Sequence, residues 1–177
     1  MKKIVFFVCA FFLMMACSHK ATNNGVPAAD AETEVAETDA LQYIDLALPG
    51  IGDNIVKVSD YVGKNKLVLI DFWASWCPPC RAEMPTVVRT YTDFHPKGLE
   101  VVGVSLDNNK DAWVKAVSEL NMSWPQMSDL RGWDCEGAQV YNVRSIPANV
   151  LVDQHGRVIA KDLRGDDLYN KVAELLK

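Results

Sequence analysis

An apolar run at residues 66–73 that leads directly into two closely spaced cysteines constrains the fold more than any other feature of the chain. The run reads Lys-Leu-Val-Leu-Ile-Asp-Phe-Trp, which is typical of a β-strand covered on both faces. A Cys-Pro-Pro-Cys motif follows at 77–80, and large apolar residues then recur at helical spacing through 84–94. Proline is tolerated in the first turn of a helix, where its missing N–H has no helical partner. The segment predicts a buried strand, a short loop and a helix that begins near Pro78.

Strand and helix patterns alternate through the rest of the chain from residue 41 onward. Short apolar or alternating segments predict strands, and apolar residues at helical spacing predict further helices. The candidate strands are 43–48 with a short partner at 55–58, then 99–106, 148–152 and 158–160, and the candidate helices are 113–120 and 168–176. We therefore expect a single α/β domain with a mixed central sheet flanked by helices.

Charge and cysteine content exclude several classes of protein. The formal net charge of −5 provides no electrostatic footprint for nucleic acid, so we expect no nucleic-acid partner. Five cysteines in 177 residues are too few for a small disulfide-stapled protein. Zinc is disfavoured because no second Cys-x-x-Cys or histidine pair completes a tetrahedral site. No flavin or nicotinamide site is visible either, and we expect neither a cofactor nor a metal.

The first sixteen residues have the layout of a secretory signal. Lys2 and Lys3 precede a 13-residue apolar run, which is short of the roughly 20 residues that a transmembrane helix needs. The sequence Leu-Met-Met-Ala-Cys at 13–17 resembles the lipobox of bacterial lipoproteins, although Met14 stands where leucine is usual. This resemblance implies that Cys17 becomes the lipidated first residue of the mature chain. The alternative is ordinary signal cleavage that releases a soluble secreted product.

The segment between the signal and the predicted domain cannot form a core. Residues 18–40 contain five acids against one lysine, and Val26 and Val35 are the only large aliphatic residues. We expect residues 17–40 to be a lipidated cysteine followed by a disordered acidic tether, with residues 41–177 as the folded domain. An acidic interaction tail is the alternative for this segment.

The two cysteines of the motif are placed differently on the predicted helix. Cys77 falls at the positive end of the helix, where the macrodipole and free N–H groups favour an anion and lower the pKa of a thiol. Cys80 lies one turn further and is expected to be covered by the helix. Arg81 either adds a positive charge to the site or is simply solvated. This arrangement favours a redox pair with Cys77 as the nucleophile.

The string Asp-Phe-Trp-Ala-Ser-Trp-Cys-Pro-Pro-Cys at 71–80 resembles the active-site segment of thioredoxins. Together with Glu-Met-Pro at 83–85, Val-Gly-Val-Ser-Leu-Asp at 102–107 and Val-Arg-Ser-Ile-Pro at 143–147, it resembles the TlpA/ResA-like branch of membrane-tethered extracytoplasmic thiol-disulfide oxidoreductases. The resemblance implies a thioredoxin fold with an extra αβ element at about 110–130. It also implies that Ile146-Pro147 is a cis-proline loop that faces the active site.

The same resemblance implies roles for individual residues. Asp71 corresponds to the buried acid beneath the cysteines, where burial raises the pKa of the carboxyl and suits it as a general base for Cys80. Glu83 either tunes the cysteines or is an exposed glutamate in the first turn of the helix. Trp73 is expected in the core. The surface that receives substrate is expected at Trp76, Pro78, Pro79, Ile146 and Pro147.

The implied reaction is dithiol exchange with disulfides in envelope proteins, of which apocytochrome c is one candidate. The two prolines of the motif remove N–H groups that could stabilise a Cys77 thiolate, which favours a reductase. A transmembrane thiol-disulfide carrier would then return electrons to the protein. We expect an exported, periplasm-facing protein that is anchored to a bacterial membrane by lipid.

The sequence is also compatible with three other functions. A disulfide oxidase or isomerase would use the same cysteines. A thiol peroxidase would need a Pro-x-x-x-Thr/Ser-x-x-Cys setting, which this segment does not supply. A binding module on a thioredoxin scaffold would not need both cysteines. Cys135 has no obvious partner, and it is either a packed thiol or a third catalytic cysteine.

Overall fold

The computed structural model describes residues 41–177, and the structural statements below concern that part of the chain. The predicted signal at 1–16, the lipidation site Cys17 and the tether at 17–40 lie outside the described residues. Within 41–177 no helix combines the length and apolar character that crossing a bilayer requires.

A five-stranded mixed sheet forms the centre of the domain, in the order β5-β4-β3-β6-β7. The central strand β3 (Leu67–Trp73) runs parallel to β4 (Leu99–Ser105) and antiparallel to β6 (Ala148–Asp153). The outer strands are β7 (Val158–Lys161) and β5 (Gln126–Met127). Every residue of β3 is buried, as its continuous apolar sequence predicts. The predicted mixed central sheet is confirmed.

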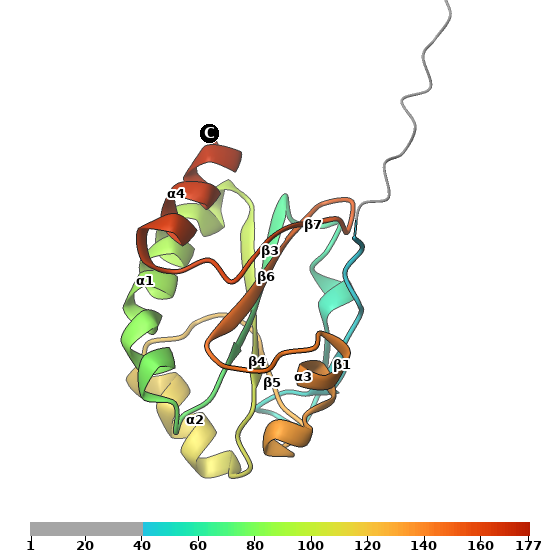
Figure 1. Cartoon of the computed structure of the whole chain (residues 1–177), viewed down its shortest axis with the longest axis vertical. Coiled ribbons are helices and arrows are strands. Elements are labelled where there is room, and N and C mark those ends of the chain that lie inside the picture. The colour runs from blue at the N-terminus through green and yellow to red at the C-terminus, as the bar shows by residue number, and fades with distance from the viewer. Residues whose placement is uncertain (1–40) are drawn as a thin grey trace, which may run out of the picture. The chain divides into compact units, whose positions relative to one another are not determined.

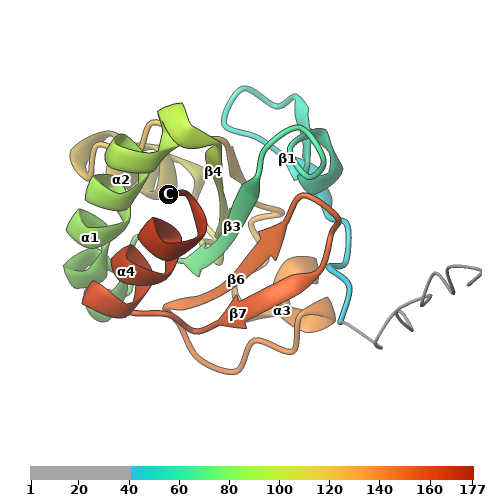
Figure 2. The same cartoon turned by 90° about the horizontal axis from the view of Figure 1, so that it is seen from above.

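Helices cover both faces of this sheet. Figures 1 and 2 show α1 (Pro78–Phe94), α2 (Lys110–Glu119) and α4 (Gly165–Leu175) on one face and the short α3 (Glu136–Val140) on the other. The helices α1 and α4 pack together, with the ring centroids of Phe94 and Tyr169 5.2 Å apart. Three short 3-10 turns complete the domain: η1 (Val58–Asp60), η2 (His95–Lys97) and η3 (Gly132–Asp134).

The first predicted strand, at residues 43–48, is wrong in its extent. A separate two-stranded antiparallel sheet contains only β1 (Ala47–Pro49) and β2 (Ile55–Lys57). The residues before β1 donate elsewhere, because the Tyr43 N–H bonds the Gly156 carbonyl at 2.8 Å and the Ile44 N–H bonds the Tyr141 hydroxyl at 2.9 Å. Because these N–H groups are bonded outside the β1–β2 pair, strand β1 does not extend back to residue 43.

The extra αβ element is present as α2 and β5, inside the predicted interval of 110–130. Sequence patterns do not identify α3, because its five residues are too few to show helical periodicity.

Close packing on the sheet needs a glycine in α3. A Cβ atom at Gly137 would lie 2.9 Å from Val104 Cγ1 and 3.1 Å from Leu46 Cδ1.

Candidate active site

The two cysteines of the motif form a disulfide at the start of α1. Their Cα atoms are 5.3 Å apart, and the side chains of both are buried. Trp76, Pro78 and Pro79 are exposed around them, with 47% of Trp76 accessible to solvent. The surface over the buried disulfide therefore consists of an indole and two proline rings.

Cys77 is the N-cap residue of α1, in an extended conformation, and the two prolines occupy the first two helical positions. Neither proline has an N–H, so the first helical amide available to the sulfur is that of Cys80, which lies 3.2 Å from Cys77 Sγ. In the reduced protein this amide and the helix dipole favour a thiolate on Cys77.

The loop before β6 brings a second segment against the disulfide. The carbonyl oxygen of Ile146 lies 3.7 Å from Cys77 Sγ, and the Ile146-Pro147 peptide bond is cis, as the resemblance implies. Both residues of this loop are half-buried. The fold therefore joins the Cys-Pro-Pro-Cys motif and the Ile146-Pro147 loop into one site.

Asp71 lies on β3 and is buried, and neither neighbouring strand places an ionisable residue opposite it. Its register partners are Gly103 on β4 and Asn149 on β6. Burial raises the pKa of the Asp71 carboxyl to about 7, the positive charge of Arg164 opposes this, and the negative charge of Glu83 adds to it. Oδ2 of Asp71 has no hydrogen-bond partner among the described residues. The raised pKa agrees with the prediction for this carboxyl.

Glu83 is neither in the first turn of α1 nor exposed, so that alternative from the sequence is wrong. It is the sixth residue of the helix and is half-buried against α4. Its Oε1 accepts a hydrogen bond from the Gly165 N–H, with 2.6 Å between the two atoms. Glu83 therefore satisfies one of the free N–H groups at the start of α4 and places a negative charge at that dipole's positive end.

Arg164 belongs to the same region, although sequence reasoning does not identify it. Its guanidinium donates to the Leu163 carbonyl at 3.0 Å and to the carbonyl of Pro147 in the loop beside Cys77. The sequence does contain one indication of its role. An arginine directly before a helix lies at the positive end of the helix dipole, and this position is unfavourable for a positive charge unless another contact compensates. Here the compensating contacts are two backbone carbonyls.

A buried carboxylate anchors the loop that carries Trp76. Asp107 Oδ2 accepts hydrogen bonds from the Ser75 N–H at 2.9 Å and from the Ser105 hydroxyl at 2.8 Å, and the Ser75 hydroxyl donates to Oδ1. Asp107 lies in the 102–107 segment of the sequence pattern, but the pattern alone assigns it no role. It ties the end of β4 to the residues just before Cys77.

The other candidate residues lie in the core or at the surface near α2. Trp73 is fully buried and donates its indole N–H to Gln126, which confirms it as a core residue. Arg81 forms an ion pair with Glu119 on α2, 3.2 Å apart at the surface. Cys135 is a free thiol that is completely buried, and burial raises its pKa. Across residues 41–177 no three metal-binding side chains gather into a cluster.

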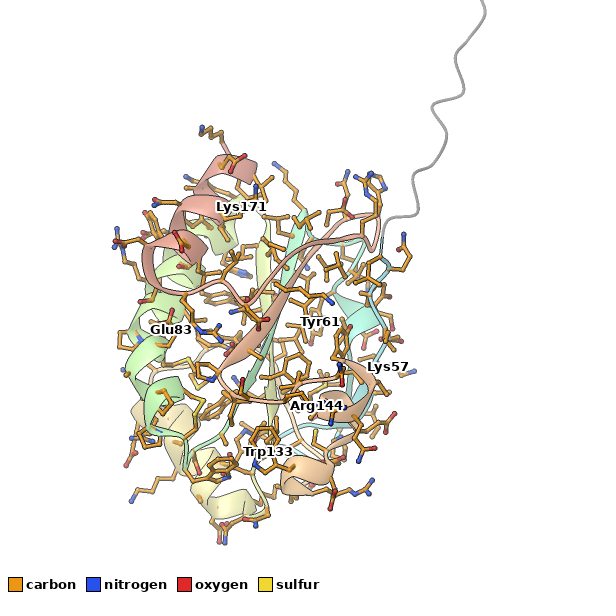
Figure 3. All side chains as sticks on the ribbon, in the orientation of Figure 1. Lys57, Tyr61, Glu83, Trp133, Arg144 and Lys171 are labelled. Atoms are coloured by element: carbon orange, nitrogen blue, oxygen red, sulfur yellow. A yellow bond between two sulfur atoms is a disulfide. The ribbon has the colours of Figure 1, made fainter. Side chains whose placement is uncertain are left out.

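An exposed tryptophan that sequence reasoning does not single out stands beside Trp76. The ring centroids of Trp76 and Trp133 are 6.3 Å apart at a tilt of 55°, and 49% of Trp133 is accessible. Figure 3 shows Trp133 near Arg144 at the end of the domain where α1 begins. Trp133, Arg144 and four further residues line a hollow of about 350 Å³. The site is thus extended by an aromatic pair with a hollow next to it.

Comparison with known proteins identifies the group to which this site belongs. The sequence profile of the AhpC/TSA family matches residues 40–161. The thiol-disulfide oxidoreductase ResA of Bacillus thuringiensis subsp. konkukian is 30% identical over 122 residues, which cover 69% of this chain and 67% of that protein. ResA of Oceanobacillus iheyensis is 32% identical over 108 residues, and the chain spans about half of that relative, 54%.

Solved structures give the same result for the fold. The thioredoxin domain of a thiol-disulfide oxidoreductase from Bacteroides vulgatus superposes with a TM-score of 0.72 at 34% identity, covering 78% of this chain and 97% of that one. A thiol-disulfide oxidoreductase from Bacteroides fragilis superposes with a TM-score of 0.72 at 30% identity, covering 77% of this chain and all of that one. The chain belongs to the AhpC/TSA family and is a thiol-disulfide oxidoreductase of the ResA/TlpA type with a thioredoxin fold.

Proposed function

We propose that this protein reduces disulfides in extracytoplasmic envelope proteins through Cys77 and Cys80. The observation that carries this proposal is the N-cap position of Cys77, whose sulfur receives only the Cys80 amide of the helix start. A thiolate with few donors is a weak leaving group in exchange, and a dithiol that is little stabilised gives up its electrons readily. Both prolines therefore favour the reducing direction.

The reaction transfers two electrons in two exchange steps. The Cys77 thiolate attacks one sulfur of the partner's disulfide, forms a mixed disulfide and releases the other partner sulfur as a thiolate. Cys80 then loses its proton and attacks Cys77 Sγ, which releases the second partner thiolate. The protein is left with the Cys77–Cys80 disulfide, and the two partner thiolates take up protons from the proton acceptor of Cys80 and from water to become thiols.

Asp71 is the proton acceptor for Cys80 in this proposal. A carboxyl with a pKa of about 7 is close to half ionised at neutral pH, so it can take up a proton and release it again. Glu83 on α1 tunes the proton affinity of Asp71, because its negative charge contributes to the raised pKa of that carboxyl. Bulk water is the alternative acceptor.

The partner binds as an extended chain across the exposed side of the site. The backbone of Ile146 and Pro147 lies at the edge of the disulfide, and the rings of Trp76, Pro78 and Pro79 present an apolar surface beside it. Apolar contact with exposed aromatic side chains and pairing with backbone groups are general ways to bind unfolded segments. Such a surface suits envelope proteins whose chain around the disulfide is unfolded, apocytochrome c among them.

The sequence supports an exported and membrane-attached protein. The signal-like residues 1–16 and the lipobox resemblance at Cys17 support our proposal that the domain lies outside the cytoplasm, attached by lipid through the acidic tether. Electrons then have to cross the membrane, and a transmembrane thiol-disulfide carrier is the donor that this arrangement requires.

The reduction potential of the Cys77/Cys80 pair, measured against glutathione, tests the direction of electron flow. We expect a value close to the about −270 mV of thioredoxin, whereas a value near the about −120 mV of a strong periplasmic oxidant would identify an oxidase. Cys80→Ser should retain mixed disulfides with natural partners in the native host. Cys77→Ser is the matched control and should retain none.

A further inference from the structure

Arg164 occupies a position that links three parts of the site. Its guanidinium donates to the Pro147 carbonyl, one residue after the Ile146 carbonyl that lies 3.7 Å from Cys77 Sγ. A guanidinium stays charged at all working pH values and offers several donors in a fixed plane. Arg164 is therefore suited to hold a loop by its backbone while it also supplies a permanent positive charge.

The chain before Arg164 is itself fixed from the sheet. Asn149 on β6 donates its side-chain N–H to the Leu163 carbonyl at 2.8 Å and accepts the Leu163 N–H at 3.0 Å. Asn149 is buried and is the register partner of Asp71 on β3. Arg164 is thus attached, through one residue, to the strand position directly beside Asp71.

The charges that face Asp71 come from two other elements. Arg164, before α4, lowers the pKa of this carboxyl, and Glu83, on α1, raises it. The neighbouring strands place Gly103 and Asn149 opposite Asp71, and neither residue titrates. Arg164 is therefore the positive charge that makes ionisation of the buried Asp71 less costly.

We propose that Arg164 is a positioning residue for thiol-disulfide exchange, which holds the Pro147 carbonyl so that the Ile146-Pro147 loop keeps its place beside Cys77, and which supports the charged form of Asp71. This rests on the proposed role of Asp71 as proton acceptor. One side chain then connects the loop that receives the partner with the group that takes the proton from Cys80. Loss of Arg164 affects binding and proton transfer together.

Two substitutions separate the charge of Arg164 from its planar donors. Arg164→Gln removes the positive charge and the fork of donors, whereas Arg164→Lys keeps the charge and loses the fork. Arg157→Gln is the matched control, because Arg157 also bonds its neighbours but lies in the β6–β7 turn, where it pairs with Asp153 at 2.7 Å. Circular dichroism and thermal unfolding establish that each variant is folded.

The first measurement is an NMR titration of the Asp71 carboxyl carbon in the oxidised protein, in which neither Cys77 nor Cys80 titrates. Arg164→Gln should raise the pKa of Asp71 by about one pH unit, the effect expected on removal of a nearby opposite charge. Arg164→Lys and Arg157→Gln should leave it near the wild-type value. This measurement does not depend on the direction of electron flow, so it separates failure of this inference from failure of the reductase proposal.

The second measurement is the steady-state reduction of insulin with dithiothreitol as the electron source. Both Arg164 variants should raise KM about tenfold, because neither side chain has the planar guanidinium that donates to the Pro147 carbonyl, and Arg157→Gln should not. An unchanged KM in both Arg164 variants, or an unchanged Asp71 titration in Arg164→Gln, overturns the proposal. If Arg164→Gln does not fold, KM of the lysine variant decides: a raised value supports the proposal and an unchanged value overturns it.

Discussion

Glu83 on the helix that carries both cysteines reaches across to the first residue of the C-terminal helix, with 2.6 Å between its Oε1 and the Gly165 nitrogen. The contact joins α1 to α4 and leaves a negative charge near Asp71. Glu83, for which the sequence left open a role in tuning the cysteines or an exposed position, is therefore part of the packing and of the electrostatics of the site.

Glu83→Gln should move the pH dependence of exchange in the direction opposite to Arg164→Gln. Because the negative charge of Glu83 contributes to the raised pKa of Asp71, its removal lowers that pKa, and Asp71 becomes able to accept a proton at lower pH. The rate of insulin reduction between pH 5.5 and 8.5 measures this. Glu174→Gln on the exposed side of α4 is the control. An unchanged pH dependence of the rate in Glu83→Gln would show that Glu83 only connects α1 to α4.

In the oxidised protein, the free energy of unfolding of Asp71→Asn minus that of wild type should be larger at high pH than at low pH. The folded-state pKa of Asp71 is raised from 3.8 to about 7, so the folded state holds its proton more tightly than the unfolded chain does. Wild type therefore loses stability as pH rises from about 4 to about 7 and loses no more above that range. Asparagine carries no charge and avoids this loss.

The expected size of this stability difference follows from the folded and unfolded pKa values of Asp71. Between pH 5 and pH 8 the stability of Asp71→Asn relative to wild type should increase by about 2–3 kcal/mol. Urea unfolding of the oxidised proteins at both pH values measures the difference, with Asp111→Asn on the surface of α2 as the control. A constant difference across this range would mean that Asp71 ionises as easily in the folded protein as in the unfolded chain.

The sequence predicts the local parts of this molecule and misses the contacts between distant segments. The buried strand, the Cys-Pro-Pro-Cys loop and the start of α1 follow from neighbouring residues, because periodicity and proline preferences act within a few positions. The contact from Glu83 to Gly165 spans 82 residues, and that from Ser75 to Asp107 spans 32. No local pattern encodes such pairs, and the tertiary fold alone brings them together.

The resemblance to known oxidoreductases recovers some of this distant information. The cis bond at Ile146-Pro147 and the α2–β5 element are both present, although spacing alone would not predict them. The resemblance does not identify Arg164 either, because the motifs that carry it end at residue 147. Its contacts are visible only once the loop before α4 is placed beside the loop before β6.

Asp107→Ala should destabilise the protein and slow exchange. The substitution leaves the Ser75 N–H and the hydroxyls of Ser75 and Ser105 without their acceptor in a largely buried place, at a cost of about 2–3 kcal/mol. The loop from Ser75 to Cys77 also loses its attachment to the end of β4. Urea unfolding and the rate of insulin reduction measure the two effects. Wild-type stability in this variant would show that water replaces the carboxylate without loss.

Trp133→Ala should weaken the binding of protein substrates without changing the chemistry at Cys77. Trp133 is half exposed and its ring is 6.3 Å from that of Trp76, so its removal takes away part of the apolar surface on which a partner chain would lie. KM for insulin should rise about threefold to tenfold, as for the loss of an aromatic interface contact. The rate with a small disulfide such as oxidised glutathione should stay the same.

Trp133→Phe keeps an aromatic ring beside Trp76 and should retain most of the affinity for insulin. Stability should change little in either variant, because exposed side chains contribute about 0.5 kcal/mol or less to the free energy of unfolding. Equal losses of rate with insulin and with the small disulfide would contradict a binding role, because a small disulfide reaches Cys77 without the aromatic pair. That outcome would assign Trp133 to the support of the Trp76 loop, whereas a loss confined to insulin places the partner chain across both indoles.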